Sequence, residues 1–145
     1  MLSFFPEFLI RRFMKFFLIT LIGLISLNVF AHDLDYGPYL KMQEALAKDD
    51  FQSALSSHKI ICDKELIHYK DDYKDCDKKF ADIETLRGSF KVLSEVYIQN
   101  GNKKELKTLT KANCSMAKGN WVQKNGELRN PYYGKSMLEC GEKLK

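Results

Sequence analysis

Four sulfur-bearing side chains near the C-terminus form two pairs, and they are the residues of this chain best suited to chemistry. Cys114 and Met116 make the first pair, and Met137 and Cys140 make the second. Thiolate and thioether sulfurs are soft ligands that select Cu(I) over hard cations. Side chains two apart in an extended segment point to one side, and side chains three apart share a face on a helical turn. The sequence therefore predicts a soft-metal site for Cu(I), built from four sulfurs.

The only tryptophan, Trp121, lies between the two sulfur pairs. Its ring could shield a bound cation by stacking over it, a contact worth about 0.5–2 kcal/mol. Ordinary core filling explains Trp121 and Met137 equally well, because Met is a common gap-filler. A second alternative is a disulfide between Cys114 and Cys140, since oxidised pairs are the rule outside the cytoplasm. Both alternatives stay open, as does a redox switch in which loss of copper lets the two thiols oxidise.

The other two cysteines, Cys62 and Cys76, are 14 positions apart in a highly charged stretch. A disulfide between them closes a loop, which is worth about 3 kcal/mol in the chain-entropy model. His58 and His68 are near enough in sequence to complete a zinc site, but the spacing lacks the close ligand pair of structural zinc. We therefore predict a Cys62–Cys76 disulfide, with both histidines facing solvent or satisfied locally.

The N-terminus has the pattern of an export signal. Basic residues up to Lys15 precede Phe16–Phe30, an apolar run of 15 residues that is short of the ~20 residues a spanning helix needs. We expect cleavage after Ala31, translation from Met14, and a single mature domain over residues 32–145. The sequence thus predicts a periplasmic or otherwise exported protein with no stable membrane anchor after cleavage.

The charge balance is mild. The full chain carries +4, and removing residues 1–31, which hold three basic residues and one acidic residue, leaves +2. Lysines are interspersed with acidic residues, which is not the pattern of a nucleic-acid surface. We expect no nucleic-acid partner.

Apolar periodicity predicts a mainly α fold, a small antiparallel bundle of about three helices followed by an irregular segment. Helices are expected to begin near Pro38, after Asp50 as N-cap, and near Lys78, and the last of them to end at Gly101 as a left-handed cap. Gly88 within the last helix suggests close helix contact.

The C-terminal irregular segment is expected to contain a short β-hairpin. Asn125-Gly126, between residues 121–124 and 127–129, is the strongest two-residue turn signal. From their spacing, we expect Arg87 and Ser94 to serve as polar partners of the C-terminal segment.

Several motifs together resemble the DUF3347 domain family. They are Leu86-Arg87-Gly88-Ser89-Phe90-Lys91-Val92-Leu93-Ser94, Cys114-Ser115-Met116-Ala117, Gly119-Asn120-Trp121, Asn130-Pro131-Tyr132-Tyr133-Gly134 and Met137-Leu138-Glu139-Cys140-Gly141. The resemblance is loose over the first two helices and close after Leu86. Ser115 stands where the family pattern has Pro, and Cys62 and Cys76 lie outside the pattern.

This resemblance implies an exported domain associated with heavy-metal efflux adaptors. The expected function is to carry or buffer copper, with such an adaptor or another periplasmic copper protein as partner. The alternative is a disulfide-stapled interaction module without metal.

An enzyme is not expected. A catalytic cysteine needs a nearby base, but His58 and His68 belong to the helical half, and no nucleophile motif surrounds Cys114. Zinc at the C-terminal sulfurs is disfavoured too, because Met is a poor zinc ligand and no His lies in that segment.

Overall fold

The computed structural model describes residues 33–145, which belong to one compact unit, His32–Lys145. The expected export signal over residues 1–31 and the expected start at Met14 lie outside the described residues. Within residues 33–145, no helix has the length and apolar character needed to cross a membrane.

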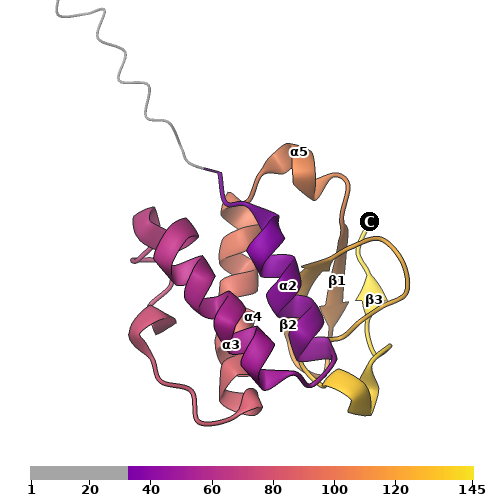
Figure 1. The fold of residues 1–145 in the computed structure, drawn as a ribbon. Coiled ribbons are helices and arrows are strands. Elements are labelled where there is room, and N and C mark those ends of the chain that lie inside the picture. The colour runs from indigo at the N-terminus through magenta and orange to yellow at the C-terminus, as the bar shows by residue number, and fades with distance from the viewer. Residues whose placement is uncertain (1–32) are drawn as a thin grey trace, which may run out of the picture. The chain divides into compact units, whose positions relative to one another are not determined.

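Two neighbouring helices open the described chain, α2 (Tyr36–Ala47) and α3 (Phe51–Ile60), as Figure 1 shows. Each begins at an aspartate whose carboxylate accepts a hydrogen bond from a first-turn amide. Asp35 accepts from Gly37 N at 2.9 Å, and Asp50 accepts from Ser53 N at 3.0 Å. The prediction of a second helix capped by Asp50 is confirmed.

The segment after α3 is irregular and covalently closed. The helix continues as a π-helical turn, η1 (Ile61–Glu65), followed by the 3-10 turns η2 (Leu66–His68) and η3 (Asp75–Asp77). Cys62 and Cys76 form a disulfide with their Cα atoms 5.4 Å apart. The predicted pairing is confirmed, and it anchors this loop to the end of α3.

The longest helix is α4 (Ile83–Asn100), capped by Asp82, whose carboxylate accepts from Thr85 N at 2.8 Å. Two predictions about its glycines are wrong. Gly88 is exposed, and a Cβ built there would meet nothing within 4 Å, so no helix packs on it. Gly101 has φ −69°, which is not left-handed. It is instead the tight approach of the Tyr36 hydroxyl and the Tyr97 carbonyl that leaves no room for a side chain at Gly101.

A small antiparallel sheet follows the short helix α5 (Lys103–Leu106). Its strands are β1 (Thr110–Cys114), β2 (Gly119–Gln123) and β3 (Glu142–Lys143), in the order β2-β1-β3. The 3-10 turn η4 (Gly134–Met137) lies between β2 and β3. The coarse prediction of a mainly α fold is confirmed, with a sheet of three strands rather than one hairpin.

The predicted position of the hairpin turn is wrong. β1 and β2 pair across Ser115–Lys118, and no strand follows Asn125-Gly126 before β3. The Gln123 side chain instead forms hydrogen bonds with backbone groups that would have paired with β2 in a strand after Asn125-Gly126. Its Nε2 donates to Glu127 O at 2.7 Å, and its Oε1 accepts from Arg129 N at 2.9 Å.

An aromatic core joins the helices to the sheet. The Tyr39 ring stacks on Phe90 and Tyr97, with centroids 5.2 and 4.7 Å away. The Tyr39 hydroxyl bonds Ser94 Oγ at 2.8 Å and accepts from Val122 N at 3.1 Å. One tyrosine of α2 therefore contacts both α4 and β2, and fixes the sheet against the helices.

Candidate metal centre

Strand pairing brings the two C-terminal cysteines together. Asn113 of β1 pairs with Glu142 of β3 in antiparallel register, which places Cys114 beside the segment that carries Cys140. The Cys114 thiol lies near enough to Cys140 to raise its pKa, and both thiols are free. Cys114 is fully buried, whereas Cys140 is partly exposed. The pair is therefore reachable from solvent on the Cys140 side only.

Burial and the adjacent Cys114 thiol both raise the pKa of Cys140 above its ordinary value. A thiol with a raised pKa stays protonated at neutral pH and is a weak nucleophile. A metal ion at this pair must displace that proton, because thiolate is the ligand form.

The buried side-chain amide of Asn130 fixes the position of the C-terminal arm, the segment of residues 137–145 that carries Cys140. Asn130 is fully buried, and its Nδ2 donates to the Cys140 carbonyl at 2.7 Å. Its Oδ1 accepts from Tyr132 N at 2.8 Å, and its own backbone N–H donates to Leu138 O at 2.7 Å. Residues 130–140 thus close into a loop around this side chain, which fixes where the second thiol lies.

The same loop is docked on α2 and α4 through Arg87. The Arg87 guanidinium is buried and donates to Pro131 O at 3.0 Å, Leu46 O at 2.9 Å and Asp49 Oδ1 at 2.6 Å. Gly134, at φ +57°, lies so close to this ion pair that a Cβ would collide with both partners. The Arg87 guanidinium therefore ties the loop to the end of α2.

Asp49 completes the docking. Its Oδ2 accepts from Lys135 N at 3.2 Å. Burial opposes ionisation of Asp49, but the bonds from Arg87 and Lys135 outweigh it and lower the pKa of the carboxyl. The expectation that Arg87 serves the C-terminal segment is confirmed. Ser94 serves it indirectly, because it bonds the Tyr39 hydroxyl that accepts from Val122 N.

Trp121 packs against the cysteine pair from inside the protein. Trp121 of β2 lies opposite Ala112 of β1. Ala112 and Cys114 are two apart on the same strand, so Trp121 and Cys114 lie on the same face of the sheet. A Cβ at Gly141, directly after Cys140, would lie 2.8 Å from the indole ring. The indole N–H donates to Gln123 Oε1 at 2.9 Å. The ring therefore fills the core, and it also closes the inner side of the thiol pair.

The two methionines differ in position. β1 ends at Cys114, so Met116 lies in the hairpin turn with 60% of its surface exposed, and the expected extended geometry is wrong. Met137 is partly buried at the end of η4, and its carbonyl accepts from Cys140 N at 3.1 Å. Met137 and Cys140 thus share a tight turn, as expected.

Across residues 33–145, no group of three or more His, Cys, Asp or Glu side chains is placed to hold a metal ion. Within the described residues, a third sulfur at the thiol pair would have to come from methionine, because Cys62 and Cys76 are bonded to each other. Sequence reasoning missed Asn130 and Asp49 as supports of the pair. Asn130-Pro131 and Asp49-Asp50 are recognisable as turn and cap patterns. The groups that Asn130 and Asp49 bond, however, lie too far away in sequence for a local pattern to indicate them.

Comparison with known proteins finds no matching family model, no matching curated protein and no matching solved structure. The resemblance to the DUF3347 domain family therefore remains a prediction that rests on the sequence motifs.

Proposed function

We propose that this protein is an exported Cu(I) carrier or buffer in which Cys114 and Cys140 are the primary ligands. The observation that carries the proposal is the contact between two free thiols drawn from segments 26 residues apart. Thiolate sulfur is the softest ligand that proteins offer, and it selects Cu(I) over hard cations. The fully buried Cys114 and the partly exposed Cys140 give one protected ligand and one that a donor or acceptor protein can reach.

Thioether ligands come from the two ends of the site. Met137 shares a turn with Cys140 and is the nearer candidate for a third sulfur. Met116 lies exposed in the turn after Cys114, a place suited to early capture or hand-over rather than to tight binding. The proposed partner is a heavy-metal efflux adaptor or another periplasmic copper protein, which follows from the motif resemblance.

A Cu(I) competition titration against a chromophoric chelator, done without oxygen, tests the proposal. Wild-type protein should take up a single copper ion per chain, and Cys114→Ser or Cys140→Ser should abolish competition. Met137→Leu should weaken the affinity more than Met116→Leu, with the buried Met42→Leu of α2 as a matched control. Full affinity in both cysteine variants would end the proposal, and full affinity in both site methionine variants would restrict the ligands to the thiols.

A second candidate function is a disulfide-stapled interaction module, favoured by the same contact between Cys114 and Cys140. Native intact mass of the exported protein separates the two. Two missing hydrogens with bound copper correspond to one disulfide and a metal carrier. Four missing hydrogens without metal correspond to two disulfides, and the interaction module would then be the function to pursue.

A further inference from the structure

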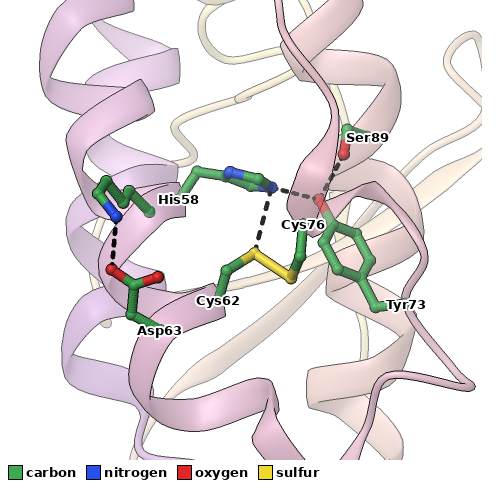
Figure 2. Close-up of a disulfide and its surroundings, with 7 residues drawn as sticks. His58, Cys62, Asp63, Tyr73, Cys76 and Ser89 are labelled. Carbon is green, nitrogen blue, oxygen red and sulfur yellow. Dashed lines mark hydrogen bonds and ion pairs between the residues drawn. A yellow bond between two sulfur atoms is a disulfide. The ribbon is translucent and has the colours of Figure 1, made fainter.

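A buried histidine lies directly against the Cys62–Cys76 disulfide. His58 lies on α3, one turn before Cys62, which belongs to η1. The His58 side chain is only 3% exposed. Its Nε2 is 3.8 Å from Cys62 Sγ and 2.7 Å from the Tyr73 hydroxyl (Figure 2). The Tyr73 hydroxyl in turn bonds Ser89 Oγ on α4. Two other elements of the fold therefore hold the imidazole at this sulfur.

The two sulfurs of the bond have different surroundings. Cys62 has the imidazole beside it, whereas Cys76 comes from η3 and approaches from the other side (Figure 2). Both cysteines are partly exposed, and Cys76 is followed by the exposed Asp77. Exposure does not distinguish the two sulfurs, but attack at Cys76 makes Cys62, the sulfur beside the imidazole, the leaving group.

We propose that Cys62–Cys76 is a redox-active disulfide that undergoes exchange with an external dithiol, with His58 stabilising Cys62 as the leaving thiolate. The incoming thiolate forms a bond to Cys76 Sγ while the Cys62–Cys76 bond breaks, and the electron pair of that bond goes to Cys62 Sγ. The proton released by the attacking thiol is taken up by His58, which gives a thiolate–imidazolium pair. The second thiol of the dithiol then attacks the mixed disulfide and releases Cys76, so the dithiol is oxidised and the protein disulfide is reduced.

The charges around His58 agree with this sequence of events. In the disulfide form, burial lowers the pKa of His58, and the nearby Asp75 only partly offsets it, so the ring is neutral. The other groups packed on the ring are Tyr73 and Phe80, and Phe80 stands edge-on at 5.0 Å. Burial raises the pKa of Tyr73, so that hydroxyl is neutral as well. A thiolate formed at Cys62 would be a new negative charge in contact with the imidazole, and it would favour the protonated ring.

His58 therefore differs from a histidine that merely fills the core. A purely structural disulfide requires no ionisable neighbour, whereas a low-pKa, exchange-competent cysteine characteristically has a cationic one. The exposed His68, ten residues further along the chain, has no such contact with a sulfur and supplies the control.

The test measures the rate at which dithiothreitol reduces this disulfide near neutral pH, by alkylation and mass of the peptides that contain Cys62 and Cys76. Reading those peptides keeps Cys114 and Cys140 out of the signal. His58→Gln should slow reduction several-fold, because a leaving thiol of higher pKa departs more slowly, and His68→Gln should leave the rate unchanged. Equal rates in wild type, His58→Gln and His68→Gln would overturn the proposal.

A measurement on the wild-type protein covers the case in which His58→Gln does not fold. The imidazole signals of His58 and His68 are titrated by NMR in the disulfide form and after reduction. Reduction should raise the pKa of His58 by about one unit or more and leave that of His68 unchanged. An unchanged His58 titration, or loss of the fold on reduction, would overturn the proposal, because the bond would then be a staple only.

Discussion

The two cysteine pairs of this protein are built differently, and the difference indicates separate tasks. Cys62 and Cys76 are 14 residues apart, close one irregular loop, and lie against a buried imidazole. Cys114 and Cys140 are brought together by strand pairing, remain free thiols, and are packed by an indole and a buried amide. An imidazole favours thiolate chemistry at the first pair. At the second pair, the raised pKa of Cys140 keeps its thiol protonated, so the proposed Cu(I) would have to displace that proton.

The largest effect should come from Arg87→Met, which acts on the Cys114–Cys140 region and leaves the disulfide region alone. Removing the guanidinium leaves the carbonyls of Leu46 and Pro131 without this donor, whereas the exposed Asp49 keeps its bond from Lys135 N. Such losses cost about 4 kcal/mol in the free energy of unfolding. Urea denaturation measures the cost, with Lys59→Met, which breaks only an exposed ion pair with Asp63, as control. A cost no larger than that of the control would contradict the docking role of Arg87.

Removing each cysteine pair should separate stability from metal binding. The Cys62→Ser/Cys76→Ser double variant should lose about 3 kcal/mol of stability, because a loop of this length is no longer closed in the unfolded chain. It should still bind Cu(I). The Cys114→Ser/Cys140→Ser variant should show the reverse, a smaller loss of stability and no Cu(I) binding. Loss of copper from the first variant would show that the two regions are not independent.

Two glycine substitutions contrast a crowded position with an open one. Gly141→Ala forces a Cβ into the Trp121 ring and the Asn113 carbonyl at φ +138°, and should cost about 2 kcal/mol. Gly88→Ala adds the same methyl group to an open helical surface, and should stabilise by up to about 1 kcal/mol. Thermal denaturation of both variants provides the measurement. A tolerated Gly141→Ala would mean that the C-terminal arm does not need its close fit to Trp121.

The last prediction concerns the pH dependence of Cu(I) affinity. Because the pKa of Cys140 is raised, its thiol is protonated at neutral pH, and Cu(I) must compete with that proton. Affinity should therefore rise with pH up to the thiol pKa and fall by up to about tenfold per pH unit below it, for each proton displaced. Competition titrations between pH 6 and pH 8 measure the slope. A flat profile would indicate a pair that is already ionised.

The parts of the fold that could be predicted are those governed by local sequence. Apolar periodicity located α2, α3 and α4, and Asp50 marked a cap because its carboxylate needs only the amides of the next turn. The Cys62–Cys76 bridge was predictable because it closes a short loop. Arg87 was recognised from its place beside the apolar stripe of α4.

The missed features depend on partners distant in sequence. Asn125-Gly126 has strong turn chemistry, but the Gln123 side chain satisfies the backbone that would have formed the next strand. The actual hairpin turn has Lys118 at φ +50°, where no glycine marks it. The fit of Gly134 against the Asp49–Arg87 ion pair joins three separate segments, which no local pattern reports.

The brevity of β3 has a consequence for association between chains. Glu142 and Lys143 are charged and exposed, and they cover this side of β1 together with Leu144, whose N–H donates to Lys111 O at 2.8 Å. Short, charged edge strands are poor templates for strands of other molecules. If the C-terminal arm were to leave, however, the uncovered N–H and C=O groups of β1 would form an unprotected edge. The movement that parts the two thiols would thus also create a nucleus for aggregation, so the same contacts that hold Cys140 near Cys114 also protect β1 from pairing with other chains.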